Sequence, residues 1–111
     1  MKTSELTGPA LDWAVAKCEG LTEDTLHWCF YEGEMVSIGA DIPFLPSTNW
    51  AQGGPIIERE RVESYYQPAL EQWAARCGDD LRYGPTPLVA AMRCFVASKL
   101  GDEIEIPEEL K

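Results

Sequence analysis

The sequence predicts an α+β domain in which the N-terminal and C-terminal helices pack on a small antiparallel sheet. Three observations carry this prediction: an apolar helical segment lies near each end of the chain, two β-prone runs meet across a short glycine-containing loop, and two more flank a glycine and aspartate turn. Two hairpins and one further strand would form the sheet. Because both helices have apolar surface to bury, we expect them to cover both faces of the sheet, as an αβα sandwich.

The C-terminal helix has the clearest boundaries, within residues 84–101. Thr86 is a suitable N-cap, Pro87 takes the first helical position, where its missing N–H costs nothing, and Gly101 follows the last apolar residue. The body of this helix is apolar almost throughout. We therefore expect it to be largely buried, with Arg93 either reaching solvent or meeting a carboxylate at the edge of the packing.

The N-terminal helix is predicted over residues 8–19, with Pro9 in its first turn and Gly20 beyond its end. Thr7, or an earlier hydroxyl residue, can cap it. At 100° per residue its apolar side chains share one arc, whereas Asp12 and Glu19 lie opposite. The pattern indicates one buried face, with Asp12 outside it.

The strands are predicted from short β-prone runs. Residues 27–31 and 35–38 flank a Glu-Gly-Glu loop and form the first hairpin. Residues 72–76 and 81–83 surround a Cys-Gly-Asp-Asp turn and form the second, and residues 62–66 supply the single strand.

The middle of the chain carries conflicting signals. Residues 39–55 contain two prolines and three glycines before Pro55 and predict a long, irregular loop. A helix is also predicted over residues 49–60, and it should be firmest after Pro55, because the glycines and the proline bend or delay it. The acidic tail at residues 102–111 fits a short edge strand, an ordered tail or a free end.

Length and composition fit one globular domain over residues 1–111. Nineteen acidic residues against nine basic ones give a net charge of −10. Because this charge repels phosphate backbones and anionic lipids, we expect neither direct nucleic-acid binding nor membrane binding. No apolar run is long enough for a membrane span or a signal region, so a cytoplasmic location is predicted.

The four cysteines lack a Cys-x-x-Cys pair, and we expect them to be reduced thiols. A zinc site built from His27 and Cys29, or a Cys/His nucleophilic pair, is an alternative that no local signature supports. Burial explains the cysteines on helices more simply. No metal, no cofactor and no catalytic residue is therefore predicted.

A more specific hypothesis is that hydroxyl residues and arginines together form a pocket that binds an anion. The hydroxyls near residue 48 and at Thr86 mark two probable helix starts, where free N–H groups attract anions. Arginines follow in the second half of the chain and could lie nearby. Capping is the simpler role for the hydroxyls, and ion pairs with acids such as Glu60 and Asp80 are the simpler role for the arginines.

Three segments then carry a family resemblance: Pro-Ser-Thr-Asn-Trp-Ala-Gln-Gly-Gly-Pro-Ile-Ile-Glu-Arg-Glu at 46–60, Trp-x-Ala at 73–75, and Tyr-Gly-Pro-Thr-Pro-Leu-Val-Ala-Ala-Met-Arg at 83–93. Together they resemble the NinX-like family of small phage and prophage proteins, a domain of unknown function. Asn49 stands where aspartate is expected in many relatives. The resemblance implies an accessory phage protein made inside a bacterial host cell.

Two functions follow as hypotheses. The first is a non-enzymatic protein that binds a host or phage protein through its acidic surface and the aromatic side chain at residue 50. The second is a protein that sequesters a small anionic, nucleotide-like ligand near the Trp50 loop and the Thr86 helix start. The oligomeric state stays open, with a homodimer as one option. The candidate ligand-binding or partner-binding residues are Thr48, Asn49, Trp50, Arg59, Arg82, Thr86 and Arg93.

Overall fold

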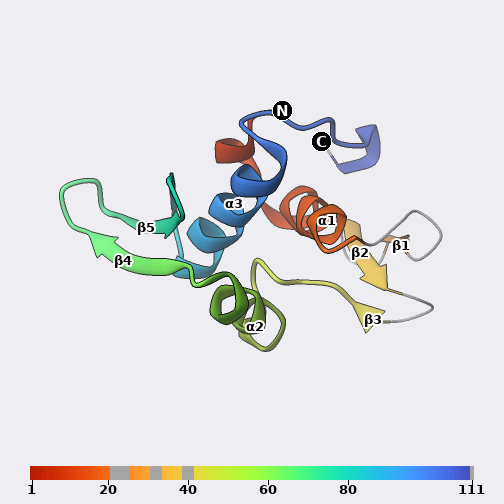
Figure 1. Ribbon diagram of the computed structural model, residues 1–111. Coiled ribbons are helices and arrows are strands. Elements are labelled where there is room, and N and C mark those ends of the chain that lie inside the picture. Colours follow the sequence, from red (N-terminus) through yellow and green to blue (C-terminus); the bar gives the residue numbers. More distant parts are fainter. Residues whose placement is uncertain (21–25, 31–33, 39–41, 111) are drawn as a thin grey trace.

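The computed structural model describes residues 1–20, 26–30, 34–38 and 42–110, with the backbone alone for residues 26–30, 34–38 and 42. Its elements follow the chain in an order that gives an α+β fold, as predicted (Figure 1). The helices are α1 (Gly8–Cys18), α2 (Trp50–Glu60) and α3 (Pro87–Leu100), with short 3₁₀ turns at Thr3–Glu5 and Glu108–Leu110. The strands are β1 (Leu26–Phe30), β2 (Glu34–Ile38), β3 (Ile42–Pro43), β4 (Glu63–Gln67), β5 (Gln72–Cys77) and β6 (Asp80–Gly84).

Helix α3 begins and ends where the sequence predicts. The Thr86 hydroxyl accepts a hydrogen bond from the Val89 N–H at 3.0 Å, and Gly101 follows the last helical residue. Between Leu88 and Ala97 every side chain except that of Arg93 is buried. A helix that is apolar on nearly every side must be covered on every side, and this places α3 at the centre of the molecule.

The strands form two separate antiparallel sheets, β1-β2-β3 and β4-β5-β6. Both predicted hairpins are confirmed by the pairing of β1 with β2 and of β5 with β6, and the predicted single strand is β4. The prediction of one sheet was wrong, because among the described strands β4 pairs with the second hairpin only, whereas the first hairpin pairs with β3.

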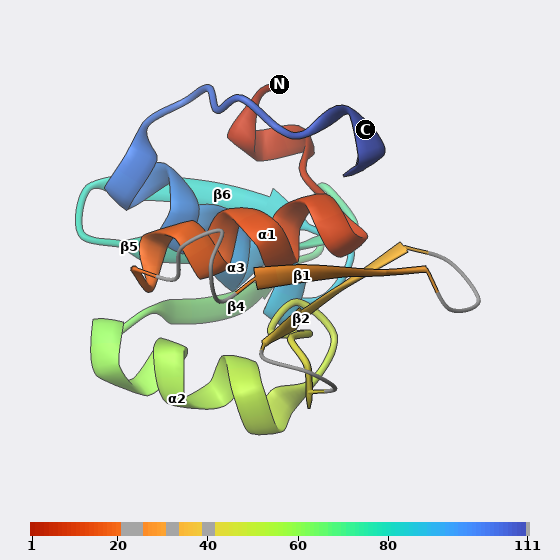
Figure 2. The same cartoon turned by 90° about the vertical axis from the view of Figure 1, so that its right-hand side faces the viewer.

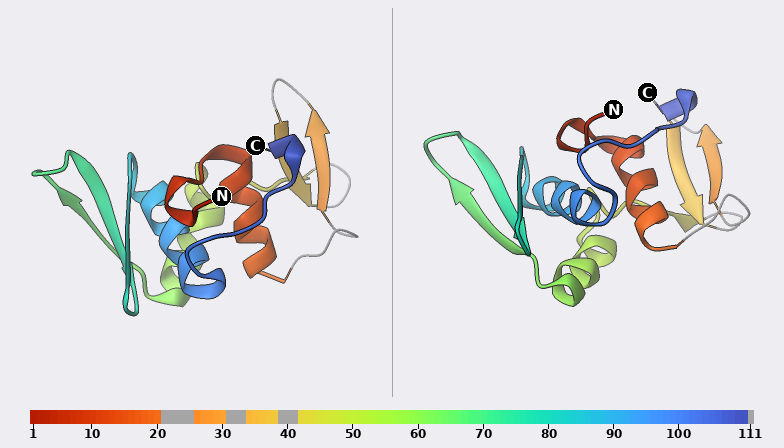
Figure 3. Two further views of the ribbon diagram at one scale, coloured as in Figure 1. Left: turned by 90° about the horizontal axis from the view of Figure 1, so that it is seen from above. Right: turned by 45° about the horizontal axis from the view of Figure 1, so that its top comes forward.

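The αβα order was also wrong. Figures 1 and 3 show α3 and α1 between the two sheets, so that the layers run sheet, α3, α1, sheet. Helix α3 packs on β5 and β6, and α1 packs on α3 and adjoins β2. The reason is that α1 and α3 both have more apolar surface than one sheet face can cover, and therefore pack on each other.

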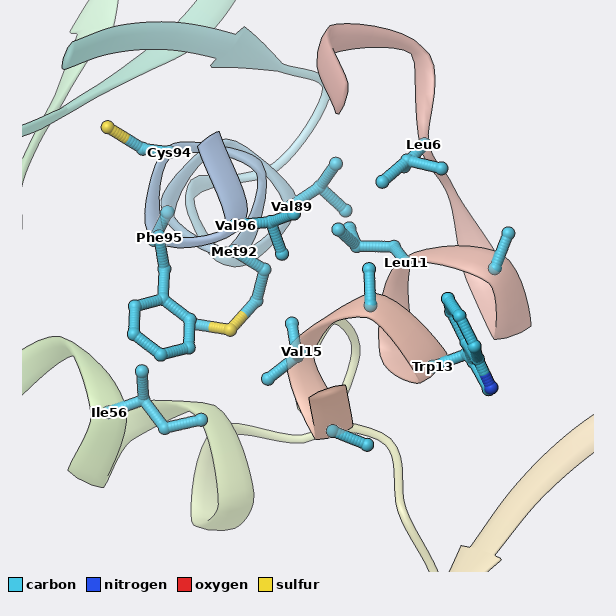
Figure 4. Close-up of a cluster of buried hydrophobic side chains, with 14 of the residues drawn as sticks. Leu6, Leu11, Trp13, Val15, Ile56, Val89, Met92, Cys94, Phe95 and Val96 are labelled. Carbon is cyan, nitrogen blue, oxygen red and sulfur yellow. The ribbon is translucent and has the colours of Figure 1, made fainter. Parts of the chain in front are cut away.

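The core between the helices is built from branched and flexible apolar side chains. In the close-up of Figure 4, Met92 of α3 faces Val15 of α1, and Phe95 lies over Ile56 of α2. The Cys94 side chain points from the other side of α3, toward the sheet. All five residues are buried, so the three helices share a single core.

Helix α1 spans residues close to the predicted range, but it is more deeply enclosed than predicted. Thr7 is its N-cap, although its side chain accepts no capping hydrogen bond. All residues from Ala10 to Ala16 are buried, and this includes Asp12 at 2% exposure. The prediction that Asp12 faces away from the core was wrong, because the chain segment before α2 covers that side of α1.

Helix α2 begins at Trp50, so residues 50–55 of the predicted loop are helical. Asn49 is the N-cap, and its side-chain oxygen accepts a hydrogen bond from the Ala51 N–H at 2.8 Å. The Gly53-Gly54-Pro55 sequence lies inside the helix. Proline removes one helical hydrogen bond at this point, but the packing of Ile56 holds the helix together.

The acidic tail is ordered along residues 102–110, where it lies beside the N-terminus (Figure 2). The terminal ammonium of Met1 donates to the Ile104 carbonyl at 2.9 Å, and the Thr3 N–H donates to the Asp102 carbonyl at 2.9 Å. Ile106 is buried, so the tail also adds to the core. Of the three predicted alternatives, the ordered tail is the one observed.

Arg93 joins three parts of the fold. Its Nε donates to the Leu6 carbonyl and its Nη1 to the Tyr83 carbonyl, both at 2.8 Å. Burial lowers the pKa of its guanidinium below the ordinary value. Instead of reaching a carboxylate, Arg93 therefore ties the segment before α1 and the end of β6 to α3.

Replacing Arg93 by methionine should lower the free energy of unfolding by about 3 kcal/mol, because two carbonyl groups lose charge-assisted hydrogen bonds. Urea denaturation measures the change. The matched control is Arg76→Met, at an exposed position on β5, which should alter the free energy by less than about 0.5 kcal/mol. Equal effects of the two substitutions would contradict the bridging role of Arg93.

Candidate binding site

A small hollow lies between the starts of α2 and α3. Its volume is about 190 Å³. We call it the Trp50 hollow, and its lining residues are Ser47, Thr48, Trp50, Thr86, Leu88 and Val89. Three of the predicted site residues, Thr48, Trp50 and Thr86, therefore come together at one place although 36 positions separate the last two.

The hollow exists because α2 approaches α3 very closely. A Cβ atom on Gly53 would lie 2.4 Å from the Pro46 carbonyl oxygen and 2.9 Å from Cδ1 of Leu88. Only glycine fits at such a distance. Gly53 thus brings the first turn of α2 beside the first turn of α3, which explains why a glycine stands inside this helix.

The turn before α2 is fixed by the side chain of Gln52. Its Oε1 accepts from the Leu45 N–H, and its Nε2 donates to the Pro43 carbonyl at 2.8 Å. The N–H groups of Thr48 and Asn49 both donate to the Leu45 carbonyl. These bonds hold the segment that carries Thr48 and Trp50 in one conformation.

Trp50 is the most exposed large apolar side chain that the structure describes, at 56% exposure. It lines the hollow from the first position of α2. Because the backbone beneath it is fixed, the indole is presented in a defined place at low entropic cost.

Free backbone donors border the same hollow. In the described part of the chain, the N–H groups of Trp50 and Leu88 have no acceptor, as is usual in the first turn of a helix. The positive ends of two helix dipoles also meet here. These groups can bind an acceptor such as a carboxylate, a phosphate or a carbonyl oxygen.

The lining residue Ser47 is bonded to Asp12, a buried residue of α1 that does not itself line the hollow. Ser47 is 1% exposed, and its N–H donates to Asp12 Oδ1 at 2.9 Å. Burial raises the pKa of Asp12 to about 6, and the donors of Ser47 oppose part of this rise. The Ser47 hydroxyl faces the carboxyl group without forming a hydrogen bond of normal geometry to any described atom.

The three predicted arginines do not line the Trp50 hollow. Arg59 pairs with Glu19 and with Glu60, the latter at 2.8 Å, and these hydrogen bonds raise its pKa. Arg82 pairs with Asp102 at 2.6 Å and lies 3.7 Å from Asp80.

Arg82 borders a different and larger hollow, of about 580 Å³, between β6 and the chain termini. Arg93 binds the carbonyl groups described above, and Asn49 serves as the cap of α2. A single pocket that combines the hydroxyls with the arginines is therefore not formed.

Neither the burial of Asp12 nor its hydrogen bond with Ser47 was predicted from the sequence. Asp12 carried no signal of its burial, because its position on the helical wheel indicated a solvent-facing side chain. Ser47 had one indirect signal, its place one residue before Thr48 in a short polar run that precedes a helix.

No metal site is seen among the described side chains. They contain no group of three histidine, cysteine or acidic residues that could hold an ion. Burial raises the pKa of both Cys18 and Cys94 to about 11, so neither is a thiolate near neutral pH. The predicted alternative site at His27 and Cys29 lies outside the described side chains.

Two comparisons bear on what this chain is. The sequence matches the family described as "Bacteriophage P22, NinX" over residues 2–99. Among curated proteins, none matches the sequence. Within the described ranges, no helix has the length and apolar character needed to cross a membrane.

The raised pKa of Asp12 predicts a specific pH dependence of stability. The folded state holds the proton up to about pH 6, against 3.8 for an ordinary aspartate. The contribution of Asp12 to stability is therefore complete below pH 4 and is lost as the pH rises through 6, a change of up to about 3 kcal/mol.

Asp12→Asn keeps the acceptor for the Ser47 N–H and removes the titration. Urea denaturation from pH 4 to 8 should show the variant gaining stability relative to the wild type across this range. Asp79→Asn, at an exposed position, is the control and should show no such trend. A constant difference between wild type and Asp12→Asn at all pH values would overturn the assignment.

Proposed function

Because the chain belongs to the Bacteriophage P22 NinX family, we propose that it is a non-enzymatic accessory phage protein that acts by binding a host or phage protein. The observation that carries the proposal is the exposed Trp50 beside the Trp50 hollow. Tryptophans next to small pockets are frequent hot spots of protein interfaces. Here the indole would enter the partner, and an apolar side chain of the partner would enter the hollow.

The charge of the molecule supports a particular class of partner. A net charge of −10 attracts proteins with a basic surface and speeds the encounter with them. Basic proteins that handle nucleic acid are abundant in an infected bacterial cell, and an acidic phage protein in the cytoplasm can compete for their surfaces. The proposed partner is thus a basic protein with an exposed apolar side chain.

A second candidate function is the sequestration of a small anionic ligand, such as a nucleotide, in the same hollow. It is favoured by the free N–H groups of Trp50 and Leu88 and by the Ser47 hydroxyl, which lines the hollow and forms no hydrogen bond of normal geometry to a described atom. The exposed indole could stack on a base.

Trp50→Ala should weaken partner binding and leave stability almost unchanged, because the side chain is more than half exposed. Affinity capture from infected cells identifies the partner, and titration with the purified partner should show a loss of at least about tenfold in affinity. Leu100→Ala, at an exposed position at the end of α3, is the matched control and should bind normally. Unchanged affinity of Trp50→Ala would refute this surface as the binding site.

The ligand hypothesis is tested with a panel of nucleotides and inorganic phosphate. A ligand that fits should raise the melting temperature of the purified protein by several degrees, and Ser47→Ala should reduce this rise. Ser64→Ala, at an exposed position on β4, should leave it unchanged. The absence of any shift across the panel would exclude this second function and leave the first intact.

A further inference from the structure

Strand β4 is an open edge of its sheet. It pairs only with β5 among the described strands, and Figures 1 and 3 show this sheet on the outside of the molecule. Four of its five residues are exposed, including Tyr65 at 39% and Tyr66 at 48%. The strand contains no lysine and no proline, which usually protect an edge from pairing, and its one charged residue is Glu63 at its first position.

The register shows where the two tyrosines lie. Tyr66 pairs with Trp73 on the face of the sheet that packs toward the core, and their rings meet edge to face at 5.3 Å. Tyr65 pairs with Ala74, whose other neighbour across the sheet is Tyr83. Because side chains alternate along a strand, Tyr65 lies on the opposite, outer face.

We propose that two copies of this chain pair through β4, antiparallel and centred on Tyr65. A symmetric antiparallel pair must be centred on a residue, and only a centre at Tyr65 uses all five residues of the strand. The result is one continuous six-stranded sheet, the closed two-fold arrangement that is commonest in homo-oligomers. This inference does not depend on the proposed function, which uses another surface.

The strand is complementary to itself in this register. Glu63 of one copy lies opposite Gln67 of the other, so no two like charges face each other. Ser64 lies opposite Tyr66, which places a small side chain beside a large one. The two Tyr65 rings meet at the centre of the outer face. For a molecule of charge −10, this uncharged strand interior is a place where two copies can approach.

Cysteine cross-linking tests the register. Tyr65→Cys should form an intermolecular disulfide rapidly under mild oxidation, because residues directly opposite each other in an antiparallel pair lie about 5 Å apart. Gln67→Cys is the control and should cross-link at least about tenfold more slowly, since its two copies would lie about 13 Å apart. A mixture of Glu63→Cys and Gln67→Cys should cross-link to each other. The unmodified protein in parallel reports any contribution of the native thiols.

Sedimentation equilibrium completes the test. The wild type should have twice the mass of the 12.4 kDa chain, and Tyr65→Lys should shift it to the monomer while circular dichroism shows the fold unchanged. A monomeric wild type at millimolar concentration would overturn the proposal. So would a dimer in which Tyr65→Cys cross-links no faster than Gln67→Cys.

Discussion

The burial of α3 on every side determines where the other elements lie. One side of this helix is covered by β5 and β6, and the others by α1 and α2. Close approach is possible because much of its surface consists of small residues, and because glycines stand where backbones meet it. A Cβ atom on Gly84 would lie 2.8 Å from the Ala90 nitrogen, and one on Gly53 would reach Leu88. Both glycines thus set the distance of a neighbouring element from α3.

Local signals predicted the elements but could not predict their layers. Caps, prolines and turn residues specify α3 and both hairpins within a few positions, because these features act between neighbours in the sequence. Whether the first hairpin pairs with β4 or β3 depends on contacts between distant residues. The helix through Gly53 and Pro55 is also poorly specified by local signals, because glycine and proline have poor helix propensity. Its conformation depends on packing against Pro46 and Leu88.

The candidate site was predictable to the same extent. Thr48, Trp50 and Thr86 stand at two helix starts, a feature that is visible in the sequence, and the structure brings these starts together. Only some of the ion-pair partners of Arg59 and Arg82 could be predicted from the sequence. Glu60 and Asp80 are near in sequence, but Glu19 and Asp102 lie 40 and 20 positions away and hold the two arginines elsewhere. Ion pairs with distant residues leave no local signal.

Asp12 connects the stability of the fold to the presentation of Trp50. A buried carboxylate is costly, and an apolar residue at this position of α1 would suit the core better. What Asp12 does is accept the Ser47 N–H, which fixes the segment between β3 and α2 against α1. The exposed indole of Trp50 follows directly after this segment, at the first position of α2. A residue that weakens the core above pH 6 but holds a surface anchor in place is expected where binding requires a rigid site, and this agrees with a binding role for the Trp50 hollow.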